Sequence, residues 1–146
     1  SAFEPRRDGE LCQGTAIRRA IAAALTAAGL TAAEIGHVAA HGLSTIDGDR
    51  IEAQAIRDTL GEAPVTALKS FFGYLGAACG ALETAASILA IQHGQVPLTL
   101  NYEHPDPDCP INVIHGRPLP IDRPTALILS YSPQGQAVAL VLGGAE

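Results

Sequence analysis

The sequence predicts an α/β domain in which helices pack on the faces of a mixed β-sheet. Segments with apolar residues at helical spacing alternate with short apolar runs, in the order helix, strand, helix, strand, helix and then strands. Glycine and proline residues separate these segments. In addition, 47% of the 146 residues are apolar and only 16% are charged, so the chain has enough apolar surface to form a folded core.

The first helix is expected to begin at Thr15, after an irregular polar lead-in over residues 1–14. From Ile17 onward, apolar residues recur at spacings of three and four until Gly29 ends the helix. A single capped turn over residues 31–34 and a buried strand over 35–40 are predicted to follow.

The middle of the chain repeats the strand-to-helix pattern. A helix is expected to start near Asp49, with Glu52 as its capping partner, and to end at Gly61. A strand over 64–68 then leads to a helix over 76–93. Because Glu83 is the only charged residue of that helix before its last residue, the helix is predicted to be buried.

The last third of the chain is predicted to be mostly extended. The expected elements are an extended segment over 96–100, a surface loop over 101–110, and strands over 111–115, 125–131 and 136–142, the last two forming a hairpin. Right-handed crossovers would place the loops 41–48 and 69–73 at the same carboxyl edge of the sheet, where ligands bind in open α/β sheets.

Composition excludes several classes of function. The net charge of −6 argues against a nucleic-acid or anionic-membrane surface. No apolar run reaches the length of about 18 residues that a transmembrane helix needs, and no signal peptide is expected. The three cysteines, Cys12, Cys79 and Cys109, indicate reduced thiols in a cytoplasmic protein. The low charge suggests that part of the surface is normally covered.

His41 is the first candidate functional residue. It follows a predicted strand and begins a loop with glycines and hydroxyl residues, where a neutral imidazole can donate a hydrogen bond or act as a base. A structural role remains the alternative for any single histidine. His37 and His41 lie four strand positions apart, roughly 13 Å, which is too far for one metal ion, so no metal site is expected.

Lys69 is the second candidate, because it follows a buried strand and precedes an almost uncharged helix. A buried lysine needs a carboxylate partner, and Glu83 is the expected one. The pair could be structural, could polarise an active-site network, or could do both.

The other reactive side chains have simpler interpretations. Cys79 is expected to be a core thiol inside a helix, away from its start. Asp49 and Glu52 are read as helix-start carboxylates rather than an acid/base pair. His104 and His115 are expected at the surface. No nucleotide-binding glycine motif occurs.

Three motifs occur in order along the chain. They are Ala40-His-Gly-Leu-Ser-Thr45 followed by Gly48-Asp49 and Glu52, the segment from Val65-Thr66 through Lys69-Ser70 to Gly80, and Val96-Pro-Leu-Thr-Leu-Asn101 with Pro107-Asp-Cys109. Together they resemble A-H-G-T-x-T…G-D…E, V-T-x-x-K-S-x-x-G-H-x-x-G-A-x-G and I-P-P-T-x-N…P-D-P-x-C of the β-ketoacyl-acyl carrier protein synthases. The resemblance runs from about Thr15 to Leu142, so residues 15–146 are interpreted as a domain like the C-terminal half of these enzymes.

The resemblance implies a fold, an activity and partners. The fold would be the C-terminal half of a thiolase-like fold. The activity would be an acyltransferase condensation of acyl thioesters with malonyl-acyl carrier protein in fatty acid or polyketide synthesis. The nucleophilic cysteine would come from an N-terminal half, and the complete protein would be a homo- or heterodimer. The chain itself would bind no cofactor, since the phosphopantetheine arm of acyl carrier protein carries the substrate.

By position, the resemblance also assigns roles. His41 matches the first catalytic histidine, Lys69 the lysine and Glu83 the buried glutamate. Thr45 matches one of two threonines that bind the phosphopantetheine arm.

The chain departs from the family pattern at three places. Tyr74 stands where the family has its second catalytic histidine, Leu43 replaces the other pantetheine threonine, and residues 132–136 form a shortened gate loop. Three functions therefore stay open: a condensing ketosynthase, a non-catalytic partner like a chain-length factor, and a thiolase-fold hydrolase or transferase acting on another thioester.

Overall fold

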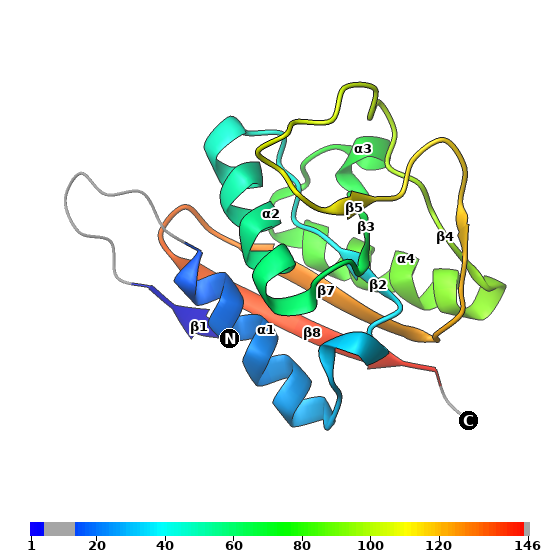
Figure 1. Cartoon of the computed structure of the whole chain (residues 1–146), viewed down its shortest axis with the longest axis horizontal. Coiled ribbons are helices and arrows are strands. Elements are labelled where there is room, and N and C mark those ends of the chain that lie inside the picture. The colour runs from blue at the N-terminus through cyan, green and yellow to red at the C-terminus, as the bar shows by residue number, and fades with distance from the viewer. Residues whose placement is uncertain (5–13, 145–146) are drawn as a thin grey trace.

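The computed structural model describes residues 1–4 and 14–144. Its main feature is a six-stranded mixed sheet with strand order β1-β8-β7-β2-β3-β5 (Figure 1). Strands β7, β2, β3 and β5 run parallel, whereas β8 is antiparallel to β7 and β1 is antiparallel to β8. These strands span Ala2–Phe3 (β1), His37–Ala39 (β2), Pro64–Thr66 (β3), Asn112–Val113 (β5), Thr125–Tyr131 (β7) and Gln136–Gly143 (β8). The predicted mixed sheet is thus confirmed.

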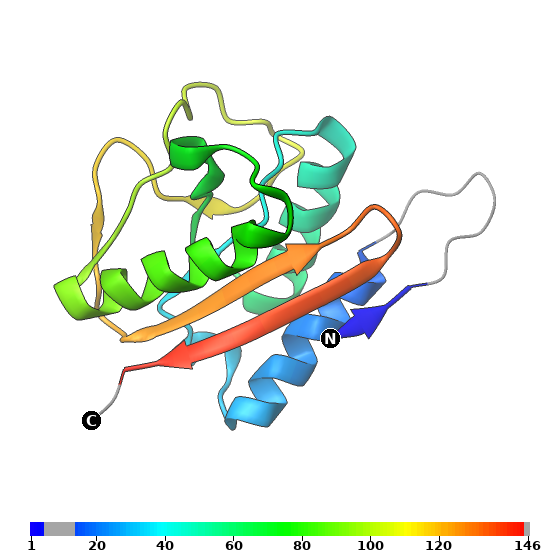
Figure 2. The ribbon, with the colours of Figure 1, turned by 180° about the vertical axis from the view of Figure 1, so that it is seen from behind.

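Helices cover both faces of this sheet. Helices α1 (Thr15–Ala28) and α2 (Ile46–Leu60) lie on one face, and α4 (Cys79–His93) lies on the other (Figures 1 and 2). A short helix, α3 (Lys69–Phe72), follows β3 at the carboxyl edge of the sheet. The remaining elements are the 3-10 turns η1 (Ala32–Glu34) and η2 (Gly76–Ala78) and the small pair β4 (Gln95–Val96) and β6 (Leu119–Pro120).

The core forms because the central strands are apolar on both faces. Along β7, Leu127 and Leu129 pack in the cluster that includes Ile17 and Ile56, from α1 and α2. Ala126 and Ile128 alternate with them and pack on the α4 side. A strand buried on both faces is typical of a parallel sheet between two helical layers.

Several element boundaries differ from the sequence-based expectation. The lead-in contributes a strand, β1, which pairs with β8; residues 5–13 lie outside the described part of the chain. Helix α2 begins at Ile46 rather than near Asp49, because the Asp49 N–H already bonds to the Thr45 carbonyl. Residues 69–72 form a helix rather than a loop. The predicted extended segment 96–100 is a strand only at its first residue, and β6 was not predicted.

Helix α4 does not have the all-round burial that its composition predicts. The stripe that faces the sheet carries Cys79, Glu83, Ser87 and Ala90, whereas Leu82, Ile88 and Leu89 are exposed. Two β8 residues, Val138 and Leu140, extend this apolar surface. They alternate with Ala139 and Val141, which pack on the α1 side, so they lie on the same side of the sheet as α4.

These five side chains (Leu82, Ile88, Leu89, Val138 and Leu140), which we call the α4–β8 face, are between 38% and 53% exposed. In Figure 2, α4 runs along β7, and β8 lies on the other side of β7 with no helix drawn over it. The chain therefore has the exposed apolar surface that its low charge implied. No helix among the described residues is long and apolar enough to cross a membrane.

We expect Gly36→Ala to destabilise the chain. Gly36 precedes β2, and a Cβ there would lie 2.1 Å from the Arg123 carbonyl oxygen and 2.8 Å from that of Thr125. Relieving such a clash requires backbone movement, which should cost about 1–3 kcal/mol or more. Gly80→Ala is the matched control, because nothing lies within 4 Å of its Cβ position and alanine favours a helix. Denaturant unfolding of the two variants measures the difference; equal stabilities would contradict the close contact.

Candidate active site

The loop after β2 and the start of α3, both at the carboxyl edge of the sheet, bring His41 and Lys69 together. Strands β2 and β3 run parallel, so the residues that follow them emerge at the same edge. The Lys69 Nζ atom lies 3.4 Å from His41 Nδ1 and donates a hydrogen bond to the His41 carbonyl. Gly42 permits this approach, since it has φ of 45° and a Cβ there would lie 2.9 Å from the Ala67 Cβ. The predicted proximity of His41 and Lys69 is confirmed, although Lys69 begins a helix and does not lie in a loop.

Lys69 and Glu83 form a buried ion pair, as the sequence predicted. Lys69 is 8% exposed and Glu83 is fully buried, and the Lys69 ammonium donates to Glu83 Oε1. Burial raises the pKa of Glu83, and the hydrogen bond and charge of Lys69 lower it in part. The pair links α3 to α4.

His41 is neutral at pH 7 in this environment. Burial, followed by the positive charge of Lys69, lowers its pKa to about 4. The ring packs against Tyr131 with centroids 4.7 Å apart, and Ser130 Oγ lies 3.5 Å from Nδ1. Because an ammonium group can only donate, its contact with Nδ1 assigns the ring proton to Nε2. His41 can therefore donate one hydrogen bond to a substrate oxygen.

Glu52 is not the helix-capping residue that the sequence suggested. Because α2 starts at Ile46, Glu52 lies in its second turn and points into the protein. Its two carboxylate oxygens accept the backbone N–H groups of His41, at 2.6 Å, and Gly42, at 2.9 Å. Burial raises the pKa of Glu52 to about 7 even though both hydrogen bonds lower it. In the sequence, Glu52 was distinguished only by its place in the first of the three motifs.

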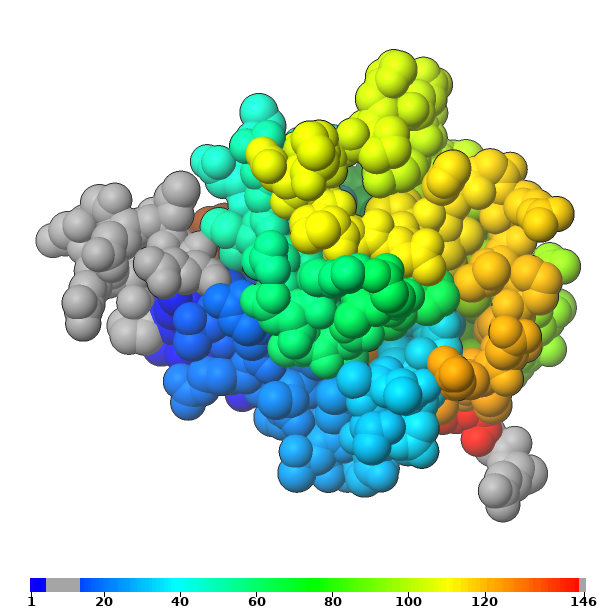
Figure 3. Space-filling view, viewed as in Figure 1, coloured from blue at the N-terminus to red at the C-terminus, as the bar shows by residue number. Residues whose placement is uncertain are grey.

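A cavity of about 450 Å³ adjoins this cluster. Lys69, Glu52, Leu43 and Tyr74 line it, together with apolar side chains from α2 and β3. The loop after residue 98 forms the opposite wall, and the surface is hollowed beside this yellow and yellow-green segment in Figure 3.

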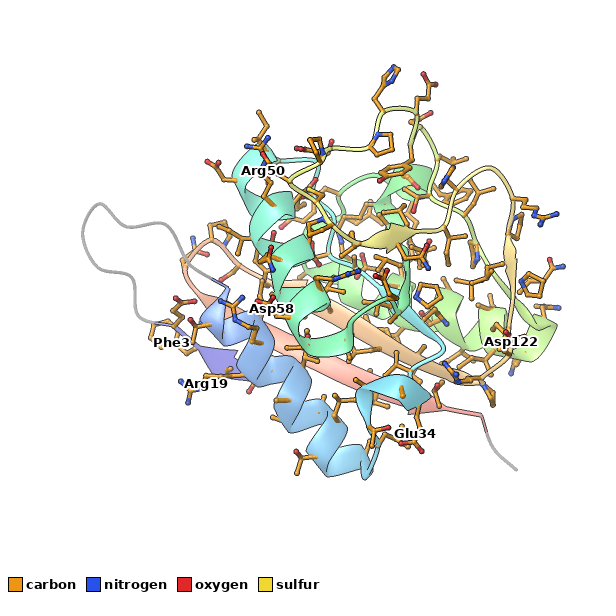
Figure 4. The ribbon with its side chains drawn as sticks, in the orientation of Figure 1. Phe3, Arg19, Glu34, Arg50, Asp58 and Asp122 are labelled. Carbon is orange, nitrogen blue, oxygen red and sulfur yellow. The ribbon has the colours of Figure 1, made fainter. Side chains whose placement is uncertain are left out.

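The loop carries two lining residues that were not among the predicted site residues, Tyr102 and Cys109; of these, Cys109 belongs to the third motif. Arg50, at the N-terminal end of α2 (Figure 4), holds the loop through ion pairs of 3.1 Å to Asp106 and 3.0 Å to Asp108.

The remaining predicted site residues are less enclosed. Tyr74 is 64% exposed at the cavity. Leu43 is half-buried, and Thr45 is exposed immediately before α2. The structure thus places Tyr74 and Leu43 at one cavity with Lys69.

His37 and Cys79 lie outside the cluster around His41. No group of three or more metal-ligating side chains occurs within residues 1–4 and 14–144. His37 is fully buried, and burial lowers its pKa to about 4. Cys79 is buried, as predicted, but it is the first residue of α4 rather than an interior one, and its Sγ accepts the Leu75 N–H at 3.1 Å.

The chain matches the family model described as "Beta-ketoacyl synthase, C-terminal domain" over residues 8–103. The chain belongs to this family. A curated relative, the tetracenomycin polyketide synthase ketoacyl synthase alpha subunit of Streptomyces glaucescens, is 41% identical over 105 residues, which is 69% of this chain and 25% of the relative. The 3-oxoacyl-[acyl-carrier-protein] synthase 2 of a Synechocystis strain is 35% identical over 131 residues, 87% of this chain and 32% of the relative.

Solved ketosynthases share the fold. The ishigamide ketosynthase/chain length factor aligns with a TM-score of 0.86 at 35% identity, covering 99% of this chain and 35% of that chain. A type II polyketide synthase acyl-carrier protein in complex with its ketosynthase aligns with a TM-score of 0.89 at 32% identity, covering 99% and 37%. The ketosynthase domain therefore has the predicted thiolase-like fold. It spans between a quarter and a third of the length of the curated relatives.

We expect a double-mutant cycle to detect the buried ion pair. Lys69→Met should cost about 3–5 kcal/mol of unfolding free energy, because Glu83 is left buried without its cation. The double variant Lys69→Met/Glu83→Leu should lose less than the sum of the single changes. Arg57→Met, in an exposed pair with Glu62, should cost less than about 1 kcal/mol. Additive effects of the two buried changes in denaturant titrations would contradict the coupling.

Proposed function

We propose that this domain supplies one half of the active site of a ketosynthase that condenses acyl thioesters with malonyl-acyl carrier protein. The proposal rests on the neutral, buried His41, which lies beside the Lys69–Glu83 pair at the carboxyl edge of the sheet. Family membership and the curated ketoacyl synthase relatives support the same reaction class.

The proposed chemistry needs a donor at an oxygen where charge develops. A cysteine from the other half of the protein would hold the acyl group as a thioester. The malonyl C–C bond to its carboxylate breaks, carbon dioxide leaves, and the electron pair forms an enolate. His41 Nε2–H donates to the malonyl thioester oxygen that becomes negative. The enolate carbon then attacks the acyl thioester, the new C–C bond forms and cysteine leaves as a thiolate.

Lys69 would act through His41 in this scheme. Its ammonium holds the carbonyl and faces Nδ1 of the same residue, so it fixes both the backbone and the tautomer. Glu83 balances the charge of Lys69 in the interior. Tyr74 stands at the position of the second donor, and its phenol, which can donate one hydrogen bond, would support the oxyanion only in part.

A non-catalytic role, like that of a chain-length factor, is the second candidate. Tyr74 and Leu43 replace residues that the family uses for catalysis and for binding the pantetheine arm, and both line the cavity. The similarity to the ishigamide ketosynthase/chain length factor fits this candidate as well. In either case we propose that the complete protein forms a homodimer or heterodimer. We also propose that it binds acyl carrier protein, with Thr45 contacting the phosphopantetheine arm. A similar ketosynthase was solved in complex with its acyl-carrier protein.

We further propose that the α4–β8 face packs against the remaining part of a longer protein. The chain spans at most about a third of its curated relatives, which leaves enough sequence for another layer. The face carries exposed apolar side chains on both α4 and β8, and exposed apolar patches mark interaction surfaces.

A charge on the α4–β8 face should prevent this association. We expect Leu89→Lys to abolish co-elution of the domain with the N-terminal half of the complete protein, produced as a separate chain, in size-exclusion chromatography. Ala27→Lys, exposed on α1 at the opposite side of the sheet, should leave co-elution unchanged. Retained co-elution of the Leu89→Lys variant would contradict this docking surface.

We expect this chain alone to form no β-ketoacyl product in a condensation assay, because the nucleophilic cysteine of the proposed reaction would come from the other half of the protein.

The sharpest test of catalysis in the complete protein concerns Tyr74. We expect the complete protein to elongate acyl chains poorly, since loss of one oxyanion donor costs about 100- to 1000-fold in rate. Tyr74→His alone should not restore activity, because Leu43 and the short 132–136 loop also differ. Malonyl decarboxylation and condensation assays measure this; robust elongation by the unmodified protein would show that tyrosine serves as the donor.

A further inference from the structure

Two buried charged side chains, Glu52 and Lys69, form hydrogen bonds with the backbone of His41. The carboxylate of Glu52 accepts the N–H groups of His41 and Gly42, and the Lys69 ammonium donates to the His41 carbonyl. Glu52 is 3% exposed, so water does not compete for these bonds. Three bonds thus fix the backbone at the point where β2 ends and the loop begins.

This arrangement constrains the imidazole because its Cα belongs to the clamped segment. Both oxygens of one carboxylate hold consecutive N–H groups, so the peptide plane between His41 and Gly42 cannot rotate without breaking one bond. Gly42 has φ of 45°, a conformation that glycine adopts without steric cost, so the loop can turn directly after His41.

We propose that Glu52 is a positioning residue that sets the orientation of His41 through the backbone of the β2–α2 loop. The assignment rests on the proposed catalytic role of His41. Glu52 acts without touching the imidazole nitrogens, and its residue type matters because only an ionised carboxylate presents two full acceptors to two adjacent N–H groups.

The clamp should depend on pH near neutrality. The charged and titratable groups around Glu52 are Asp49 on the same helix, Lys69 on α3 and His41 at the end of β2; Tyr102 and Cys109 line the facing cavity wall. The negative charge of Asp49 raises the pKa of Glu52 and Lys69 lowers it, with burial the dominant cause of its value of about 7. As pH rises through 7, Glu52 ionises and accepts both bonds fully; below 7 its protonated oxygen accepts more weakly.

Backbone NMR of the chain tests the clamp without any assumption about activity. The amide shifts of His41 and Gly42 should titrate with a midpoint near pH 7, and this titration should disappear in Glu52→Gln. Hydrogen exchange at one of the two amides should rise about 10-fold or more in this variant, since glutamine has a single acceptor oxygen. Glu62→Gln, exposed at the start of the α2–β3 loop, should retain both the titration and the slow exchange.

Kinetics of the complete protein test the consequence for catalysis. Glu52→Gln should lower kcat for malonyl decarboxylation by roughly 10- to 100-fold, with KM nearly unchanged, and should remove the acid-side decline of the rate near pH 7. Glu52→Asp should recover part of the rate. If Glu52→Gln does not fold, hydrogen exchange at the His41 and Gly42 amides of the unmodified chain decides. Fast exchange of both amides in the unmodified chain, or exchange that is unchanged in Glu52→Gln, overturns the proposal. Normal amide behaviour in a protein without decarboxylase activity overturns only the proposed function.

Discussion

The buried ammonium group of Lys69 is the constraint on which the rest of the site depends. A positive charge that is 8% exposed is stable only where several acceptors converge on it. Here the acceptors come from the Glu83 carboxylate on α4 and the carbonyl of His41 at the end of β2. One side chain therefore ties α3, α4 and β2 together at the carboxyl edge, the edge where open α/β sheets bind their ligands.

The unusual polarity of α4 follows from this constraint. The helix must turn Glu83 toward the sheet to reach Lys69, and Cys79, Ser87 and Ala90 share that stripe because they lie about one turn apart. Leucine and isoleucine side chains are then left exposed on the outer stripe, as Val138 and Leu140 are on β8. The orientation of α4 that buries Glu83 therefore also leaves the leucine and isoleucine side chains of this helix exposed.

His41 gains its chemical character from its surroundings. Burial and the Lys69 charge keep its ring neutral, and the ammonium beside Nδ1 leaves the proton on Nε2. Two ions hold the residue from opposite sides, Glu52 at its N–H and Lys69 at its carbonyl. A donor that is already oriented loses little free energy to reorganisation when charge develops on a substrate, which is the basis of oxyanion stabilisation.

The sequence by itself determined the alternation of helices and strands, the boundaries of α1 and β7, and the pairing of Lys69 with Glu83, because these depend on local periodicity and on the cost of an unpaired buried charge. The motif spacing also indicated the family. Only the tertiary structure decided the role of Glu52, the exposed face of α4 and the cavity wall formed by Tyr102 and Cys109. Glu52 has the spacing of a capping residue, and α4 has the composition of a buried helix. Which side each turns to the core is set by packing between elements distant in sequence, and local pattern does not encode that packing.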